Sequence, residues 1–225
     1  LTGTTTKTYD GTTTATLTPA NFLLRGFVNG DPASATKTTG DYASKNVGSN
    51  LMVSTSLTSS DFVPAGTTQL SNYSLPASAS GPIGSITPAP LTVTAKDASK
   101  TFGQKLNFTG NEYSVSGLQN GETIGTVVLF SEGFDATASV AGSPYPIIPN
   151  ASGGTFSPSN YNITYVDNLT STINPAPLTV TAQQVTRTYD GTTLATGSGT
   201  VGVLAGAGAG ELVNAAGTQA FLDKN

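Results

Sequence analysis

The sequence Tyr-Asp-Gly occurs twice in this chain, at Tyr9-Asp10-Gly11 and at Tyr189-Asp190-Gly191, and each copy is followed by two threonines. These residue types can form a tight turn, in which the Asp carboxylate accepts a backbone N–H and glycine supplies a positive φ. The tyrosine then packs inward with its hydroxyl hydrogen-bonded at the edge of the core. We interpret both copies as structural turns, with a ligand-binding role for Asp10 as the alternative.

Carboxylates could also do chemistry, because several of them together can hold a metal ion. Most of the other Asp residues are scattered singly along the chain: Asp31, Asp41, Asp61, Asp97, Asp135 and Asp167. Calcium needs several oxygen ligands that converge at about 2.4 Å, and the sequence has no loop of the EF-hand type. We therefore predict no metal ion and no other cofactor, with a calcium site built from separate loops as the alternative.

Lysine and tyrosine support two further hypotheses. Some bacterial pili and adhesins carry Lys–Asn crosslinks, for which Lys7, Lys45 and Lys100 could supply the amine. Such a crosslink needs an apolar pocket, and lysine is seldom buried, so we expect these lysines to be exposed. Some tyrosines could stack on sugars, although packing in the core is the default for tyrosines near strand ends. The candidates for sugar stacking are Tyr42, Tyr73, Tyr145 and Tyr161.

The composition excludes whole classes of function. Cys, His and Trp are absent, which removes thiolate nucleophiles, disulfides, the Ser-His-Asp triad and nearly all transition-metal sites. Charged residues make up 10% of the chain, the net charge is −4, and no basic run could follow a phosphate backbone. No stretch approaches the length of a membrane-spanning apolar segment. We predict no catalytic residues, no enzymatic activity, no nucleic-acid partner and no membrane span.

The chain contains internal repeats. The sequence Pro-Ala-Pro-Leu-Thr-Val-Thr-Ala begins at Pro88 and again at Pro175. Phe102-Gly103 follows the first copy at the distance at which Tyr189-Asp190-Gly191 follows the second. Asn72-Tyr73 and Asn160-Tyr161 also correspond, near the other end of each repeat. Self-similarity of this kind predicts tandem modules.

We expect three modules, at residues 1–88, 89–175 and 176–225. The first lacks its first strand, the third is the N-terminal half of a second copy of the first type, and the whole reads as part of a longer array. The prolines that mark the boundaries are Pro88, Pro90, Pro175 and Pro177. Because Pro-Ala-Pro favours extended backbone and its prolines cannot donate to a sheet, we expect a short, semi-stiff spacer.

Local patterns predict β-strands throughout. Leu91, Val93 and Ala95 alternate with threonines, which is typical of a half-buried strand, and residues 163–166 are β-branched or aromatic. A short helical turn could follow each Asn-Gly sequence, at Asn29-Gly30-Asp31 and Asn120-Gly121-Glu122, or Asn-Gly could form a hairpin turn.

The fold class predicted is all-β, with at most one short helix in each module. Small β-sandwich (Ig-like) and β-grasp-like modules remain alternatives, arranged as an elongated tandem array. The Gly/Ala-rich stretch at residues 199–210 lacks the spacing of a phosphate-binding loop and is interpreted as a loose strand or loop.

The motifs resemble the YDG repeats of bacterial surface adhesins. The resemblance rests on Thr-Tyr-Asp-Gly-Thr-Thr and on the Tyr-Ala-Ser-Lys-Asn element at residues 42–46. Residues 100–103, 117–123 and 160–165 resemble the companion MBG-type repeat, because Phe102-Gly103 departs from Tyr-Asp-Gly. Such repeats alternate in giant filamentous-haemagglutinin-like exoproteins. The resemblance implies an extracellular, cell-surface role in adhesion or biofilm structure, without catalysis.

We therefore expect a stalk segment of a secreted bacterial adhesin or of an extracellular surface filament. Its partners would be neighbouring repeats or subunits of the same protein, with extracellular polysaccharide or a host or matrix surface as further candidates. One alternative is a carbohydrate- or matrix-binding module. Another is a self-assembling filament subunit that is completed by strand exchange.

Overall fold

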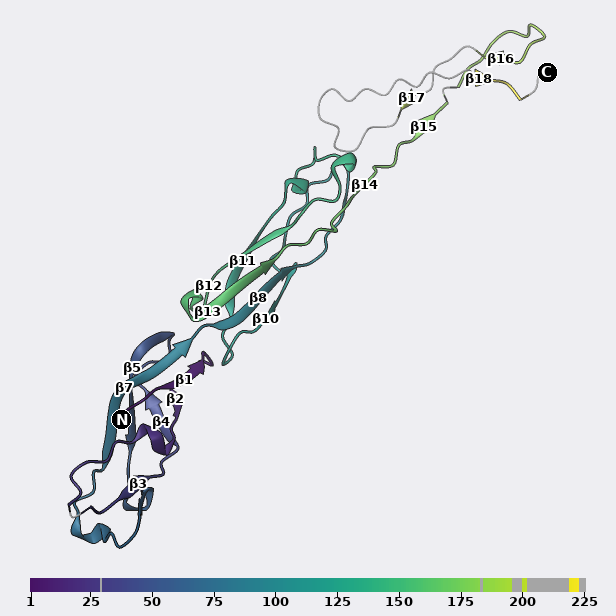
Figure 1. The fold of residues 1–225 in the computed structure, drawn as a ribbon. Coiled ribbons are helices and arrows are strands. Elements are labelled where there is room, and N and C mark those ends of the chain that lie inside the picture. Colours follow the sequence, from purple (N-terminus) through teal and green to yellow (C-terminus); the bar gives the residue numbers. More distant parts are fainter. Residues whose placement is uncertain (29, 183, 196–199, 202–218, 223–225) are drawn as a thin grey trace. The chain divides into compact units, whose positions relative to one another are not determined.

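The computed structural model describes residues 1–28, 30–182, 184–195, 200–201 and 219–222, and in them the chain is all-β (Figure 1). Every helix among these residues is a single 3-10 turn: η1 (Pro19–Asn21), η2 (Ser59–Asp61), η3 (Leu70–Asn72), η4 (Glu132–Phe134), η5 (Val140–Gly142) and η6 (Pro158–Asn160). None of them is long or apolar enough to cross a membrane. The all-β prediction is confirmed, and the several small sheets are consistent with β-sandwich-like modules.

The Asn-Gly sequences do not lead into helices. Strand β3 (Ala33–Ala35) follows Asp31 closely, and β11 (Ile124–Phe130) follows Glu122. Asn120 and Gly121 have φ values of +48° and +70°, as in a type I′ turn, although the flanking strands, β10 (Tyr113–Ser116) and β11, belong to different sheets. Of the stretch 199–210, the described part is only β17 (Thr200–Val201).

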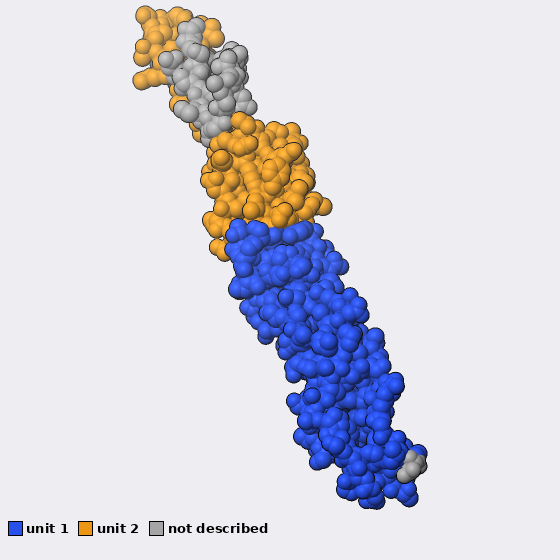
Figure 2. Space-filling model, turned by 90° about the vertical axis from the view of Figure 1, so that its left-hand side faces the viewer, with its two compact units in different colours: residues 1–93, 115–126, 151–165 blue, residues 94–114, 127–150, 166–225 orange. Residues whose placement is uncertain are grey.

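The chain divides into two compact units (Figure 2). One unit comprises residues 1–93, 115–126 and 151–165, and the other comprises residues 94–114, 127–150 and 166–225. The first unit therefore contains the whole first repeat together with three segments of the second. Residues of both repeats therefore pack together within that one unit.

A five-stranded sheet forms the first repeat. Its strands, in spatial order, are β1 (Thr5–Thr8), β7 (Ser78–Thr87), β5 (Gly48–Ser56), β4 (Thr39–Tyr42) and β2 (Thr14–Thr16). β1 and β7 run parallel, whereas the other neighbours are antiparallel. A separate antiparallel pair joins β3 to β6 (Phe62–Pro64). The chain thus enters this sheet on β1 and leaves it on β7 in the same direction.

Burial in this repeat alternates along the strands. On β5, Val53 and Thr55 are buried while Met52 and the serines point to solvent. Gly84 on β7 lets the Tyr42 ring lie against the backbone, since a Cβ there would be 2.6 Å from Tyr42 Cε1. The buried apolar side chains of the repeat are Tyr9, Ala15, Leu17, Ala35, Tyr42, Val53, Leu57, Phe62, Ile83 and Ile86.

The two Pro-Ala-Pro segments, both predicted to be spacers, differ in where they lie relative to the strands. Pro88 is the single residue between β7 and β8 (Ala89–Ala95), and Pro90 lies within β8, so the extended chain passes almost directly between repeats. Along β8, Leu91, Val93 and Ala95 are buried, which confirms the predicted alternation. Pro175 and Pro177 instead lie in the segment between β14 (Ile173–Asn174) and β15 (Val180–Thr181).

Like the first repeat, the second contains a parallel pair of strands. β8 lies between β10 (Tyr113–Ser116) and β13 (Tyr161–Val166), β11 pairs with β12 (Ile148–Gly154), and β9 (Lys100–Thr101) runs parallel to β14. Lys100 faces Ile173 as Lys7 faces Ile86 in the parallel pair of the first repeat. The predicted strand at residues 163–166 is confirmed as part of β13.

The third segment repeats the first where it is described. β16 (Leu194–Ala195) pairs antiparallel with β18 (Gln219–Ala220), and β15 pairs with β17. The Phe221 N–H donates to the Thr193 carbonyl at 2.8 Å, as the Tyr42 N–H donates to Thr13 at 2.7 Å. Sequence repetition is therefore matched by repeated hydrogen bonds.

The alternation of buried and exposed side chains along β5 can be tested by mutation. Val53→Ala removes two methyl groups from a side chain with no exposed surface, and we expect a loss of about 2 kcal/mol in the free energy of unfolding. Met52→Ala is the matched control on the opposite face, 47% exposed, with an expected change within about 0.5 kcal/mol. Urea unfolding measures both, and equal losses would contradict the assigned faces.

Candidate functional site

The Tyr-Asp-Gly turn at the end of β1 is held by its own side chains. Asp10 Oδ1 accepts hydrogen bonds from the Thr12 N–H at 2.9 Å, the Thr12 hydroxyl at 2.8 Å and Lys7 Nζ at 2.8 Å. Burial acts to raise the pKa of Asp10, but the hydrogen bonds from Lys7 and Thr12 outweigh it and hold the pKa below its ordinary value. Gly11 has a φ of +76°. The Asp10 carboxylate therefore serves the turn.

Tyr9 reaches out of the first repeat into residues of the second. Its N–H donates to the Thr87 carbonyl at 2.8 Å, which fixes the turn on the β1–β7 pair. Its ring is 2% exposed, and its hydroxyl donates to Glu122 Oε1 at 2.5 Å. The other oxygen of Glu122 accepts from the Tyr161 hydroxyl at 2.5 Å. One carboxylate thus binds two tyrosine hydroxyls from distant parts of the sequence.

The β10–β11 turn presents Glu122. The Glu122 N–H donates to the Gln119 carbonyl at 2.9 Å, and the central residues Asn120 and Gly121 both have positive φ, so the turn is of type I′. The Gln119 N–H donates to the Tyr161 hydroxyl at 3.0 Å, which leaves that hydroxyl's proton for Glu122. We call Gln119, Glu122, Asn160 and Tyr161 the Glu122 socket.

Backbone and amide contacts extend the joint around this socket. Asn120 Nδ2 donates to the Gly11 carbonyl at 3.2 Å, and a Cβ on Gly11 would lie 2.5 Å from the Asn120 Cβ. Asn160, only 1% exposed, accepts from the Val47 N–H at 3.0 Å and donates to Asn46 Oδ1 at 3.0 Å. The first repeat therefore contacts the socket at two loops, and glycine is needed where the backbones approach most closely.

Ring packing and electrostatics complete the joint. The Tyr9 and Tyr161 rings meet edge to face, with centroids 5.4 Å apart. Burial and the hydrogen bonds to Glu122 raise the pKa of Tyr9 and of Tyr161 to about 12, so both hydroxyls are proton donors at neutral pH. Glu122 is half-buried, and a carboxylate whose two oxygens each accept an O–H is a structural hydrogen-bond acceptor.

The corresponding turn of the second repeat lacks these groups. The Phe102 N–H donates to Asn174 as Tyr9 does to Thr87, and Gly103 has a φ of +86°. Without the Asp, Lys100 points elsewhere: Nζ donates to the Asp135 carbonyl, and the residue is only 6% exposed. Burial lowers the pKa of Lys100. The expectation that this lysine is exposed was wrong.

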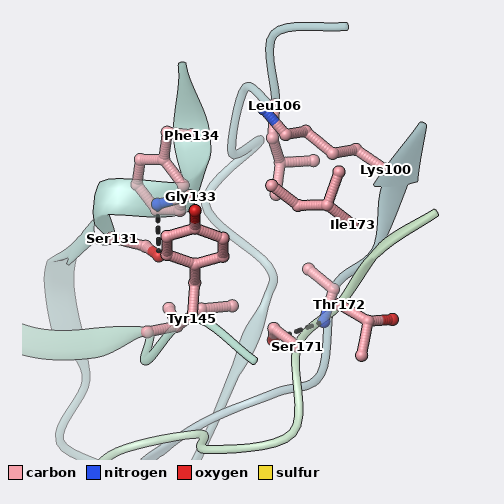
Figure 3. Close-up of a pocket in the computed structure, with 11 residues that line it drawn as sticks. Lys100, Leu106, Ser131, Gly133, Phe134, Tyr145, Ser171, Thr172 and Ile173 are labelled. Atoms are coloured by element: carbon pink, nitrogen blue, oxygen red, sulfur yellow. Dashed lines mark hydrogen bonds between the residues drawn. The ribbon is translucent and has the colours of Figure 1, made fainter. Parts of the chain in front are cut away.

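Lys100 lines a small cavity of about 10 Å³ (Figure 3). Tyr145 lies across from it in the close-up, beside the Ser131 hydroxyl, which accepts from the Gly133 N–H at 3.2 Å. The residues that line the cavity include no Asn, Asp or Glu. The groups that a lysine crosslink needs are therefore not gathered around this cavity.

The third segment carries the same turn. Asp190 Oδ1 accepts from the Thr192 N–H and hydroxyl at 2.9 Å each, and Arg187 Nη1 donates to Asp190 Oδ2 at 2.7 Å. Gly191 has a φ of +75°. Tyr189 is 69% exposed, so its ring does not have the inward packing predicted for it. The turn is formed whether or not its tyrosine is covered.

Other predicted sites are dispersed. Tyr42 and Tyr161 are buried, so four tyrosines do not form one sugar-stacking surface. Within the described part of the chain no three residues of the His, Cys, Asp and Glu types are grouped as a metal site. The contact that sequence reasoning missed is Tyr9 with Glu122. The motifs around both residues were visible, but nothing in their spacing indicated that they meet.

The two repeats match two different family models. Residues 1–81 match the family model of the YDG domain, and residues 91–170 match the MBG domain (YGX type). No curated protein and no solved structure matches the chain. The resemblance inferred from the motifs is confirmed, and the Tyr9–Glu122 hydrogen bond joins the two matched segments.

Tyr9→Phe tests the joint, because it removes one hydroxyl and leaves Glu122 Oε1 without that donor. We expect the free energy of unfolding to fall by about 1–3 kcal/mol in urea titrations. Tyr189→Phe is the matched control in the same motif, where the hydroxyl is exposed and the expected change is within about 0.5 kcal/mol. Equal effects of the two changes would be evidence against a role for Tyr9 beyond its own turn.

The raised tyrosine pKa values predict a loss of stability in alkali. Between the ordinary pKa of about 10 and the folded value of about 12, the unfolded chain has lost these phenolic protons while the folded chain keeps them. The contribution of these two tyrosines to the free energy of unfolding is therefore fully present below pH 10 and is lost as the pH rises toward 12. Ultraviolet titration should show Tyr9 and Tyr161 ionising late, and a single midpoint near 10 for all 8 tyrosines would contradict this.

Proposed function

Because this chain carries a YDG domain and an MBG domain in tandem, we propose that it is a load-bearing stalk segment of a secreted bacterial adhesin or surface filament. Domains of these families are in general non-catalytic repeat domains and are surface- and adhesin-like. On this proposal the modules are residues 1–88, 89–175 and 176–225, and they act in series outside the cell. The segment contributes to adhesion or biofilm structure by holding another part of the protein away from the cell surface.

The Tyr9–Glu122–Tyr161 joint is the observation that carries this proposal. A flexible linker between two binding modules would leave their facing ends hydrated. Here the tyrosines are 2% and 6% exposed, and their hydroxyls share one carboxylate. Pro88 alone separates the strands that lead from one repeat to the next. Such a connection transmits force between repeats with little slack.

Strand pairing supports the same proposal. β1 and β7 run parallel over four residue pairs, from Thr5 with Gly84 to Thr8 with Thr87. A pull on the two ends of the first repeat would slide these strands along each other. The hydrogen bonds between them lie across the line of pull and must break together, which resists extension better than opening one bond at a time. β9 and β14 have the same parallel arrangement.

The carbohydrate-binding alternative has weaker support. Two of its four candidate tyrosines are buried, and the low content of charged residues suits a segment that makes few specific contacts. Extracellular polysaccharide and host or matrix surfaces stay candidate partners of the adhesin to which this stalk segment would belong. In this segment the proposed partners are neighbouring repeats.

Single-molecule stretching of the chain tests the load-bearing role. We expect discrete unfolding steps, including one from the first repeat. Because the chain has no Cys, Thr6→Cys with Ser85→Cys can staple β1 to β7 across a register pair. Oxidation should shorten that step by roughly 260–280 Å, the extended length of the enclosed residues, and reduction should restore it.

Smooth extension at low force, with no steps, would contradict a load-bearing role. Co-sedimentation of the unmodified chain with extracellular polysaccharide provides a separate comparison. Saturable binding there would favour the carbohydrate-binding alternative for this segment.

A further inference from the structure

The joint between the two repeats holds two phenols against one base. The Tyr9 and Tyr161 rings meet edge to face with centroids 5.4 Å apart, and each hydroxyl donates to one oxygen of Glu122 at 2.5 Å. All three residues belong to the same compact unit. Of the ring contacts among the described residues, only this one joins two tyrosines. The joint is therefore a preformed tyrosine pair with a carboxylate between its hydroxyls.

This arrangement favours the loss of an electron from either ring. When a phenol is oxidised by one electron, its proton becomes strongly acidic and must leave. A carboxylate that already accepts the O–H takes that proton along the existing hydrogen bond, so no cationic radical has to form. With pKa values of about 12, both phenols keep their protons at neutral pH until they are oxidised. Glu122 is half-buried, so it can pass each proton on to water.

The positions of the two hydroxyls match the product of radical coupling. Two tyrosyl radicals join through a ring carbon next to the oxygen, a Cε atom of each residue, and the product carries its hydroxyls side by side. Here both hydroxyls converge on one carboxylate, so the adjacent Cε atoms lie in the same region. Coupling therefore requires the rings to turn and the repeats to stay where they are.

We propose that Tyr9 and Tyr161 form a dityrosine crosslink when the chain meets a one-electron oxidant, with Glu122 as the proton acceptor. Each phenol loses one electron and its proton, and the two radicals form one C–C bond between Cε atoms. The hydrogen on each coupled carbon then leaves as a proton, and each oxygen regains one. The pair has lost two electrons and two protons. A peroxide that takes them up, activated to a one-electron oxidant, is reduced to two waters.

The other described tyrosines lack one part of this arrangement. The Tyr42 and Tyr145 hydroxyls donate to backbone carbonyls, which are poor bases. The Tyr73 hydroxyl donates to a carboxylate, but its ring meets Phe27, which has no phenolic hydroxyl. The crosslink is therefore specific to the joint between the repeats.

The crosslink would replace a noncovalent contact between the first and second repeats with a covalent bond. Tyr9 lies in the segment that matches the YDG domain, and Tyr161 lies in the segment that matches the MBG domain. The proposal does not depend on the stalk function, which needs only the hydrogen-bonded joint. A chain that extends smoothly under load would contradict the stalk and leave the crosslink untouched.

Oxidation of the dilute chain by a photo-activated ruthenium complex with persulfate tests the proposal. Both reagents are small, and an electron can leave a covered ring without direct contact, so the burial of the pair does not prevent the reaction. We expect dityrosine fluorescence in chains that stay monomeric on denaturing gels. Peptide mass spectrometry should find Tyr9 joined to Tyr161 with the loss of two hydrogens, whereas oxidation of Met52 adds an oxygen.

Variants separate the parts of the mechanism. Tyr9→Phe keeps the ring and removes the phenol, so the crosslink to Tyr161 should be absent. Tyr165→Phe is the matched control, because it removes a phenol that is 38% exposed elsewhere, and the Tyr9–Tyr161 crosslink should form as in the wild type. Glu122→Gln keeps the shape of the side chain and removes the base, so crosslinking should slow by roughly 100-fold. Circular dichroism shows whether each variant is folded.

The same oxidation in urea shows whether the pair is set by the fold. In the unfolded chain the tyrosines are no longer held together, so the specific crosslink should be lost among many products. Equal yields of it in folded and unfolded chains would overturn the proposal, as would a folded wild type whose exposed tyrosines are oxidised while Tyr9 and Tyr161 stay unlinked. A folded Glu122→Gln variant that crosslinks as fast as the wild type would overturn the role of the carboxylate.

Discussion

A single carboxylate links the two repeats, and the rest of the joint depends on how its charge is satisfied. Glu122 is half-buried, and taking a carboxylate out of water is unfavourable unless donors replace the water. Tyr9 and Tyr161 supply an O–H to each oxygen of Glu122. Separating the two repeats would expose the Tyr9 ring and leave Glu122 Oε1 without its donor. The hydrogen bonds therefore favour one defined contact between the repeats.

The sheets place these three side chains with little freedom. The β1–β7 register ends at Thr8 with Thr87, and the next N–H, from Tyr9, donates to the Thr87 carbonyl. The type I′ turn sets Glu122 beside the start of β13, where Tyr161 follows a 3-10 turn. The Tyr-Asp-Gly motif therefore has two tasks: Asp10 and Gly11 form the turn, and Tyr9 reaches the neighbouring repeat. In the third segment the first task is complete while Tyr189 stays exposed.

Sequence patterns predicted the local features and missed the long-range ones. Alternation along residues 91–95 predicted the strand and its buried face, because period 2 is a property of the backbone itself. Turn chemistry predicted the conformation of Tyr9-Asp10-Gly11. The contact of Tyr9 with Glu122 depends on how the repeats meet, and no local preference encodes it. Lys100 was misjudged for a related reason: its buried amine donates to the carbonyl of Asp135, 35 residues away, and no local pattern encodes that contact.

A double-mutant cycle on Tyr9 and Glu122 measures the central interaction directly. The free energy of unfolding is determined for the wild type, Tyr9→Phe, Glu122→Gln and the double variant. We expect a coupling free energy of about 1–3 kcal/mol, because both single changes remove the same charged hydrogen bond. Additivity within about 0.5 kcal/mol would show that Tyr9 and Glu122 contribute independently, which would contradict this account of the joint.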